Sequence, residues 1–506
     1  MQTERGPFRI LLIAAALFYL FFIMRTAFPA GGKTYFTLVD DAMVSMRYAR
    51  NLARGQGLIW NPGQPAVQGY TNLGWTLVMA GVHLLPIPQP YISLAVMLVS
   101  VAILLANIVV VRAVVLTIDP SARLAALAAA AMTAFYFPLI FWSLRGLEVG
   151  ALALATGLGV LSAFRASAAP TPRSISLLTL SLCAALLLRM DAVLPVALIL
   201  IYLARKSPRT AVVPAIASIL ILVVILAFQK AYYADFFPNT YYLKVSGVST
   251  WERVRTGLTS LVDYASRDFL MPLFIVLLGL VYFKRLRSPE ALLLLGLFLV
   301  QAAYSVWVGG DYAEELVDSA NRFIAQGMPA LIMLFGLGLE HMLRSLPEIR
   351  VRPSAAVAIG LAAVLVISGE PWFQWGLVNA PMLRTDIQRA RLGLHIKEYT
   401  DATAVIAVHA AGQIPYYSER TTIDLLGKND PVIAKGPPAA AFAPGHNKWN
   451  YEYSILQLQP DVVADNFNKL RGFMEDHPEY RLLPNGIYVR AASTLVDLDG
   501  LATDYR

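Results

Sequence analysis

Two adjacent aspartates, Asp40 and Asp41, are the residues whose placement most strongly suggests catalysis. They follow an apolar run near the N-terminus and directly precede a stretch that reads as a helix. Two neighbouring carboxylates at an apolar surface repel each other, which can hold one proton near neutral pH. A carboxylate so placed can take a proton from a hydroxyl group as a general base. The structural alternative is that one of the two caps the helix by accepting a free N–H.

Basic residues near this acid pair suggest an anionic partner. Arg47 and Arg50 recur on one face of the expected helix, and guanidinium groups grip phosphate through paired N–H donors. Lys244, in a later loop rich in tyrosine, can bind phosphate as a point charge. We therefore predict that Arg47, Arg50 and Lys244 bind a lipid phosphate, with contact to lipid headgroups as the alternative for the two arginines.

Further candidates for substrate contact are polar or aromatic residues of the same loops, together with the acid-rich segment 311–318 and a histidine near the C-terminus: Tyr48, Tyr70, Asn72, Asp235, Asn239, Asp311, Arg322 and His446. The tyrosines of the later loop, 232–244, have a simpler explanation, because Tyr and Trp collect at membrane interfaces. The acidic loop could face water, or its oxygens could hold a divalent metal weakly. No zinc-protease motif and no ATP-binding Gly-rich loop is present in the sequence.

The composition indicates which elements must position these residues. The chain has 506 residues, of which 57% are hydrophobic and 15% charged. Soluble domains have about 45–50% apolar and about 25% charged residues. A single water-soluble fold is excluded, and we predict a polytopic α-helical membrane protein.

About eleven apolar runs approach the roughly 17–25 residues that a transmembrane helix needs: 9–27, 91–117, 123–142, 147–164, 174–189, 191–204, 211–232, 269–283, 289–308, 323–343 and 354–371. Lys and Arg in alternate loops place the N-terminus in the cytoplasm, because cytoplasmic loops carry an excess of positive charge. The same alternation puts the acid pair and the C-terminal segment outside. Two charged pairs at outer span ends, Arg145 with Glu148 and Arg189 with Asp191, read as mainly structural.

The net charge of +8 comes from these loops, since residues 371–506 carry 13 Lys and Arg against 15 Asp and Glu. The sequence therefore gives little support to nucleic-acid binding, which needs a basic patch on a soluble element.

Two regions lie outside the predicted spans. The first outer loop, residues 28–90, contains a short apolar segment at 75–85 that we expect to lie as a helix in the membrane interface. Residues 372–506 are predicted to form an extracytoplasmic α/β domain, with a helix at 389–399 and strands near 404–408, 421–425, 461–464 and 486–489. Residues 1–371 would form the membrane domain with its loops.

This order of elements resembles the GT-C glycosyltransferases, membrane enzymes that use polyprenyl-phosphate sugars. Short blocks of the sequence look closest to the actinobacterial terminal arabinofuranosyltransferases and their bacterial relatives: Asp40-Asp41-Ala42, Arg47-Tyr48-Ala49-Arg50-Asn51, Asn61-Pro62-Gly63, Gly69-Tyr70-Thr71-Asn72, Pro238-Asn239-Thr240, Gly309-Gly310-Asp311 and Asp424-Leu425-Leu426-Gly427.

The resemblance implies an inverting glycosyltransferase of a bacterial inner membrane. It would move one sugar, arabinofuranosyl or another pentosyl or hexosyl residue, from a polyprenyl-phosphate carrier to a hydroxyl of an envelope glycan, lipid or protein. The acid pair inherits the role of catalytic base, with Asp41 preferred over Asp40. Some relatives require a divalent cation such as Mg or Mn at this acid and others do not.

A lipid or solute transporter of the envelope is the alternative. Transporters typically show inverted repeats and polar residues near the bilayer midplane. In this sequence no repeat is visible, and the ionisable residues gather at span ends and outer loops.

Overall fold

The computed structural model describes residues 5–267, 288–312, 321–344, 352–378, 380, 382–465 and 469–505. These residues fall into two compact units. Unit 1 comprises residues 1–25, 97–226 and 253–381, and unit 2 comprises residues 26–96, 227–252 and 382–506. Long helices α4 and α10 run from one unit into the other, and each unit is described by itself below.

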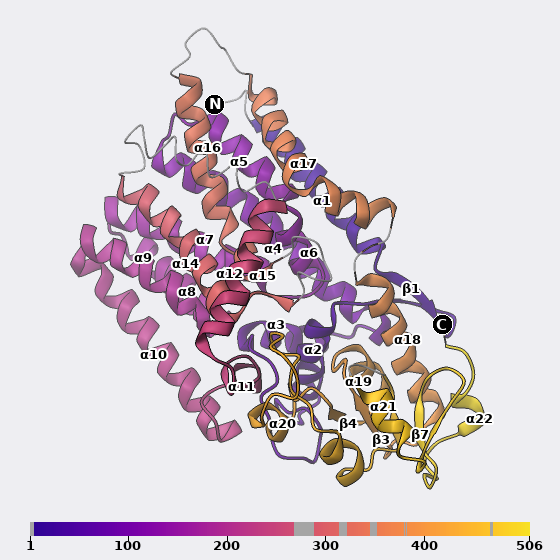
Figure 1. Cartoon of the computed structure of the whole chain (residues 1–506). Helices are drawn as coiled ribbons and strands as arrows, with labels where there is room; N and C mark the ends of the chain where they lie inside the picture. The colour runs from indigo at the N-terminus through magenta and orange to yellow at the C-terminus, as the bar shows by residue number, and fades with distance from the viewer. Residues whose placement is uncertain are drawn as a thin grey trace. The chain divides into compact units, whose positions relative to one another are not determined.

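Within its described residues, unit 1 is helical (Figure 1). Its helices, including those that it shares with unit 2, are α1 Arg5–Met24, α4 Gln89–Ile118, α5 Arg123–Phe135, α6 Phe137–Leu144, α7 Val149–Ala168, α8 Pro172–Leu188, η1 Met190–Ala192, α9 Val193–Lys206, α10 Pro208–Tyr233, α12 Thr250–Arg267, α14 Pro289–Val308, α15 Arg322–Ala325, α16 Met328–Arg344 and α17 Pro353–Leu377.

Among the described residues, five helices are long and apolar enough to cross a membrane: α1, α4, α7, α10 and α14. The number rises to seven if two bent pairs each form one span. One pair is α5 with α6, bent by 47° where the predicted run 123–142 breaks at Tyr136. Proline is common in the first turn of a helix, and Pro138 lies in the first turn of α6, directly after the break. The chain is a multi-pass membrane protein, and the predicted run 269–283 lies outside the described residues.

Close packing in unit 1 depends on small side chains. Helix α5 is rich in alanine and packs against α16 and α17 (Figure 1). A Cβ atom added to Gly336 would lie 2.9 Å from the carbonyl oxygen of Ala125, and one added to Gly360 would lie 2.6 Å from that of Ala128. Small residues let membrane helices approach to this distance, where van der Waals contact stabilises the pair.

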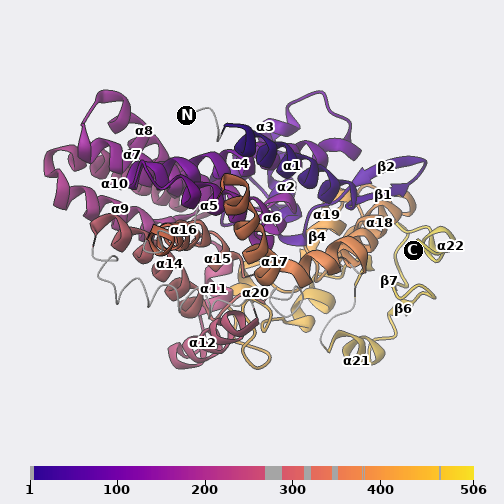
Figure 2. The same cartoon turned by 90° about the horizontal axis from the view of Figure 1, so that it is seen from above.

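Unit 2 contains two sheets. A hairpin pairs β1 Ala27–Ala30 with β2 Lys33–Phe36, and Figure 2 shows its strands side by side. The second sheet has the order β4-β3-β5-β7-β6, in which β3 runs parallel to β4 and β5 while β7 is antiparallel to β5 and β6. Its strands are β3 Val405–Val408, β4 Thr421–Asp424, β5 Val462–Val463, β6 Tyr480–Leu482 and β7 Tyr488–Arg490.

The helices of unit 2 are α2 Asp40–Ala53, α3 Leu73–His83, α11 Asn239–Val245, α18 Leu383–Tyr399, α19 Gln413–Ser418, α20 Pro431–Lys435, η4 Glu452–Gln457, α21 Leu470–Glu475 and α22 Leu498–Leu501. The predicted helix at 389–399 and the four predicted strands are present, with shifts of a few residues at their ends. The apolar segment 75–85 is helical, as α3.

The first outer loop and the C-terminal sheet share one hydrophobic core. Tyr48 and Trp60 from the loop are buried with Ile396 of α18 and Ile406 and Val408 of β3. The sequence interpretation had grouped this loop with the spans, as part of 1–371. In the structure it folds with the C-terminal residues, because its aromatic side chains complete their core.

Candidate active site

The acid pair forms the first two residues of α2. Val39, and neither aspartate, is the N-cap residue; it is in extended conformation and makes no side-chain capping hydrogen bond. The capping interpretation of the two aspartates is therefore wrong, and their carboxylates make other contacts.

Asp40 is tied to the C-terminal part of unit 2. Its Oδ1 accepts hydrogen bonds from the backbone N–H groups of Gly412, at 3.0 Å, and Gln413, at 3.3 Å. A Cβ atom on Gly412 would lie 2.6 Å from this oxygen and 2.1 Å from the carbonyl oxygen of Asp40, so only glycine fits. Burial raises the pKa of Asp40, although the charges of Arg389 and Lys428 act in the opposite direction. The Asp40 carboxyl is therefore held in place by the backbone of residues 412–413.

Asp41 forms an ion pair with Lys428. The Asp41 side chain keeps 36% of its surface exposed and that of Lys428 keeps 21%, so solvent reaches the pair. Burial by itself would lower the pKa of Lys428, but Asp41 and Asp40 outweigh it and the pKa lies above its ordinary value. The Asp41 carboxylate is thus partly open to solvent, whereas Asp40 Oδ1 is held by two backbone N–H groups.

The loop that carries Lys428 is fixed by a buried carboxylate at the end of β4. Asp424 accepts from the backbone N–H groups of Leu426, Gly427 and Asn429 at 2.8–3.1 Å, and from the Asn429 amide at 2.9 Å. Gly427 has φ +80°, a conformation that glycine adopts without strain. These bonds hold the backbone of Lys428 in one place.

His446 and Lys244 complete the cluster. The His446 Nδ1 lies 3.0 Å from the carbonyl oxygen of Pro444, which can only accept, so Nδ1 carries the proton. Burial, with the charges of Lys428 and Lys244, lowers the pKa of His446 to about 4. A Cβ atom on Gly445 would lie 3.9 Å from Cε of Lys244. A neutral imidazole is therefore held near two lysines and Asp41.

Arg47 is a structural residue, contrary to the prediction of phosphate binding. Its guanidinium is 2% exposed and donates to backbone or side-chain oxygens of five residues: Trp60, Asn61, Pro415, Arg420 and Thr422. All five of its N–H groups are thereby used. Arg50 is also buried, lies over the Tyr416 ring and donates to the Tyr416 carbonyl at 2.5 Å. Spacing had placed both on one helix face, but that face packs against residues 415–422.

Three predicted substrate-binding residues also belong to the packing. The Tyr48 hydroxyl contacts Val67 and Asn429, the Tyr70 hydroxyl lies 2.9 Å from that of Tyr233, and the Asn72 Oδ1 accepts from Ser45 and Thr76. Each of the three is at most 4% exposed. The prediction of substrate contact is corrected for Tyr48, Tyr70 and Asn72, because burial leaves no surface for a ligand.

Asp235 and Asn239 tie the second loop to the rest of unit 2. Asp235 pairs with Lys435 at 2.6 Å and accepts from Tyr242 at 2.7 Å. Burial alone would raise the pKa of Asp235, but these two partners lower it to about 2. Its side chain keeps 21% of its surface exposed, so contact of Asp235 with a substrate stays a prediction. Asn239 is buried, and its backbone N–H donates to the carbonyl oxygen of Gln68 at 2.9 Å.

Asp311 and Arg322 lie in unit 1, where Arg322 Nε is 3.2 Å from Asp311 Oδ2. The neighbouring acids of the predicted loop, Glu314, Glu315 and Asp318, lie outside the described residues. Arg189 pairs with Asp191 as expected, and it also pairs with Glu148, which had been assigned to Arg145.

A divalent cation does not fit the described residues of the cluster. Nowhere in the described part of the chain do three or more His, Cys, Asp or Glu side chains gather as metal ligands. At the acid pair, Asp41 binds an ammonium and Asp40 binds two backbone N–H groups. Divalent cations such as Mg²⁺ need oxygen ligands, so we derive no step through a metal.

The sequence interpretation missed Lys428, Gly412 and Arg389. Lys428 directly follows the block Asp424–Gly427 that carries part of the family resemblance, and this adjacency was the only local signal for it. Its pairing with Asp41 joins residues 387 positions apart, which no periodicity reveals.

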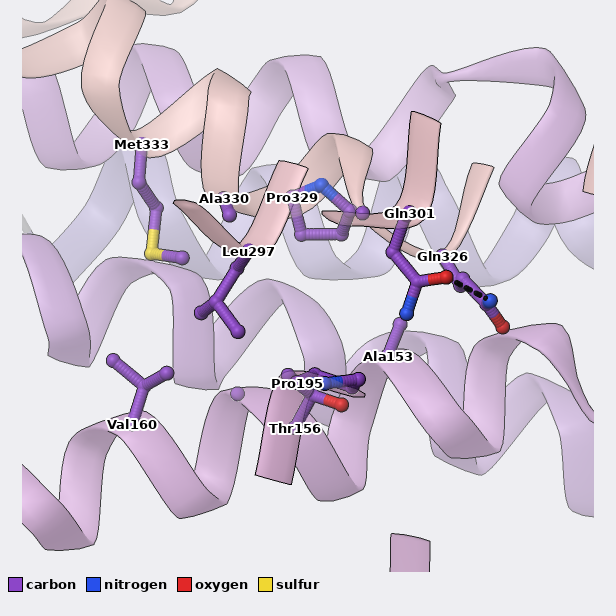
Figure 3. A pocket seen from close by; sticks show the side chains of 12 residues that line it. Ala153, Thr156, Val160, Pro195, Leu297, Gln301, Gln326, Pro329, Ala330 and Met333 are labelled. Atoms are coloured by element: carbon purple, nitrogen blue, oxygen red, sulfur yellow. Dashed lines mark hydrogen bonds between the residues drawn. The ribbon is translucent and has the colours of Figure 1, made fainter. Parts of the chain in front are cut away.

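A small cavity in unit 1 offers no competing site (Figure 3). Its volume is about 20 Å³, enough for about one water molecule. Apolar side chains line it together with Thr156, Gln301 and Gln326, and the amides of the two glutamines hydrogen-bond at 2.6 Å. It contains no titratable side chain.

By sequence, residues 379–497 match the family model of a domain of unknown function, DUF8728. This region contains Gly412, Lys428 and His446. Among curated proteins, no sequence matches the chain.

Solved structures match over most of the chain. ArnT from Cupriavidus metallidurans bound to undecaprenyl phosphate gives a TM-score of 0.59 at 11% identity, covering 96% of this chain and 98% of that one. The same protein in the apo state gives a TM-score of 0.55 at 13% identity, and the match covers 82% of this chain and 85% of that one. The Archaeoglobus fulgidus oligosaccharyltransferase, in complex with Zn and sulfate, gives 0.53 at 14% identity; the match covers 82% of this chain but only 62% of that protein. The chain therefore has the fold of the GT-C membrane glycosyltransferases.

Proposed function

We propose that this chain is a membrane glycosyltransferase that moves one sugar from a polyprenyl-phosphate carrier to a hydroxyl acceptor. The observation that carries the proposal is the solvent-accessible Asp41 beside Lys428, in a chain with the GT-C fold. The structural neighbour named above was solved with undecaprenyl phosphate, which supports a carrier of this chemical class.

Asp41 acts as the general base. Its carboxylate is exposed enough to meet an acceptor hydroxyl, whereas that of Asp40 holds the Gly412 and Gln413 amides. A base on one side of the anomeric carbon and a phosphate leaving on the other favour a single displacement, which inverts the configuration of that carbon.

Lys244 and Lys428 bind the carrier phosphate in this proposal. They replace Arg47, whose five N–H groups all donate within the protein, and Arg50, which is buried and donates to the Tyr416 carbonyl. Electrostatic stabilisation of charge on a leaving group is often the largest contribution to catalysis. A phosphate leaving group already carries charge, so no nucleotide is needed.

The sugar is an arabinofuranosyl or another pentosyl or hexosyl residue, and the acceptor is an envelope glycan, lipid or protein. The proposed location is the bacterial inner membrane, with the N-terminus in the cytoplasm and residues 372–506 outside. Lys and Arg in alternate loops support this orientation.

The test is release of polyprenyl phosphate by the purified protein, supplied with a panel of polyprenyl-phosphate sugars and an envelope glycan extract. Asp41→Asn should lower the release rate by about 10²–10⁴-fold, the usual contribution of a general base. Asp499→Asn, at an exposed surface position, is the matched control and should keep full activity.

If the Asp41→Asn variant still released polyprenyl phosphate at the normal rate, another residue would have to be the general base. No release from any donor, together with movement of labelled lipid between the leaflets of a vesicle, would favour the transporter instead.

A further inference from the structure

Lys428 interacts electrostatically with more than one carboxylate. Its ammonium pairs with Asp41, and its charge also interacts with those of Asp40 and Asp424. The charges of Lys428, Lys244 and Asp41 all act on His446, and a Cβ atom on Gly445 would lie 3.9 Å from Cε of Lys244. Lys428 therefore belongs to a cluster in which two ammonium groups and a neutral histidine lie near the Asp41 carboxylate.

The position of Lys428 is fixed while its side chain stays accessible. The Asp424 hydrogen bonds hold the loop backbone, and the Asn429 amide oxygen lies 2.9 Å from the Tyr48 hydroxyl. The side chain keeps 21% of its surface exposed and reaches Asp41 from this base. The Lys428 side chain is therefore held at a fixed place and is partly open to solvent.

The charges of the transfer reaction suggest a use for this arrangement. The acceptor oxygen forms a bond to the anomeric carbon while the bond from that carbon to the phosphate oxygen breaks. The hydroxyl proton goes to Asp41, and the electron pair of the broken bond stays on the phosphate. Asp41 thus loses one negative charge and the phosphate, a diester in the donor and a monoester afterwards, gains about one.

We propose that Lys428 is a shared counter-ion that pairs with Asp41 in the resting protein and with the carrier phosphate as the sugar is transferred. This inference rests on the proposed function. An ammonium within reach of both groups always has a negative partner during the transfer. The negative charge that Asp41 loses on protonation appears on the phosphate. Binding of the donor also draws Lys428 from Asp41 and frees that carboxylate to accept a proton.

The other described groups near the pair are not placed to act as the shared counter-ion. Asp40 is held by the Gly412 and Gln413 amides, Asp424 is enclosed by its own loop, and Arg389 acts on Asp40. His446 is neutral at pH 7. Lys244 adds a second positive charge to this cluster, which favours entry of a phosphate there.

A permanent salt bridge is the competing description, and the chain provides an example. Lys397 pairs with Glu419 at 2.5 Å, also within unit 2.

A water-soluble carbodiimide joins a lysine to a carboxylate in contact with it, so mass spectrometry of peptides can follow both pairs in one sample. In the full-length protein without lipid, we expect cross-links between Lys428 and Asp41 and between Lys397 and Glu419.

Added undecaprenyl phosphate should suppress the Lys428–Asp41 cross-link by at least about fivefold, with half-suppression at the lipid concentration that half-saturates binding. The Lys397–Glu419 cross-link should not change. A Lys428–Asp41 cross-link that persists while the lipid is bound, as measured by native mass spectrometry, would overturn the shared counter-ion. A protein that neither binds the lipid nor releases it from any donor would instead refute the proposed function.

Kinetics provide a second readout. Lys428→Met should lower kcat by about a hundredfold, as loss of one stabilising donor typically does, and Lys428→Arg should restore part of it. Lys397→Met is the matched control. If Lys428→Met changed only the folded fraction, with kcat per folded molecule intact, the inference would be wrong.

Discussion

The Tyr48 hydroxyl lies 2.9 Å from the amide oxygen of Asn429, the residue directly after Lys428. This contact joins the helix that begins with the acid pair to the loop that supplies its lysine. Gly69 donates its N–H to the same hydroxyl at 3.0 Å, so one buried tyrosine connects three segments. The distance between Asp41 and Lys428 thus depends on groups that never meet a substrate.

Tyr48→Phe tests this connection. We expect the free energy of unfolding to fall by about 1 kcal/mol, the net value of a typical buried hydrogen bond, and kcat to fall by more than the folded fraction does. Tyr505→Phe, near the C-terminus, is the control. Thermal unfolding and single-turnover release on the same preparations give both quantities, and an unchanged kcat per folded molecule would refute the connection.

Gly412→Ala should displace Asp40, because the new methyl group would lie 2.1 Å from its carbonyl oxygen. Overpacking of this kind costs about 1–3 kcal/mol, and we expect release to slow by at least about tenfold. Gly472→Ala introduces the same methyl group where no atom lies within 4 Å. Equal melting temperatures and rates for the two variants would contradict the tight fit at Gly412.

Arg47→Met should destabilise the protein by about 2–4 kcal/mol, since several buried oxygens lose their donor at once. Its effect should appear in thermal unfolding, with the KM for the donor unchanged in the molecules that remain folded. Arg471→Met, at an exposed ion pair, should be neutral. A raised donor KM with normal stability would restore Arg47 as a phosphate ligand.

Lys244→Met should show the opposite pattern. Loss of one charge-assisted contact of about 1.5 kcal/mol would raise the donor KM about tenfold with little change in melting temperature. The measurement is initial release rate against donor concentration. An unaltered KM would remove Lys244 from the phosphate site.

His446 makes the stability of the protein depend on pH. Burial and the charges of two lysines lower its pKa to about 4 in the folded protein, against 6.5 for the free group. Below pH 6.5 the unfolded chain therefore binds the extra proton more readily, and stability falls as the pH drops from about 6.5 towards 4.

The loss should be about 3 kcal/mol, since the pKa is lowered by about 2.5 units and one unit corresponds to about 1.4 kcal/mol. Melting temperatures between pH 7.5 and 4.5 should fall less steeply in His446→Gln than in the wild type or in the control His477→Gln. Parallel curves for all three proteins would show that His446 does not titrate in this way.

The elements of this chain are largely readable from local sequence, because hydrophobic length and turn residues determine them. Four of the five strands of the C-terminal sheet were predicted within a few residues, while β6 was not predicted, and helix α18 begins six residues before the predicted helix. Helix α3 was predicted as well. The break between α5 and α6 was missed, since apolar runs on both sides of Tyr136 read as one span.

The roles of buried polar residues were much less readable. Periodicity placed Arg47 and Arg50 on one face, but it does not tell whether that face meets lipid, water or protein. Residues 415–422 cover it, and they are nearly 370 positions away. Asp41 was predicted from the adjacent acid pair and from the family resemblance, whereas its partner Lys428 could be identified only from the fold.

Asp41 is synthesised 387 residues before Lys428. Translation at about 5–20 residues per second leaves the aspartate without its lysine for roughly 20 to 80 seconds. During this time the growing chain already carries its first acid but cannot assemble the proposed reaction centre. A nascent or prematurely terminated polypeptide that ends before Lys428 would therefore lack the proposed reaction centre, which would tie the proposed activity to completed biosynthesis.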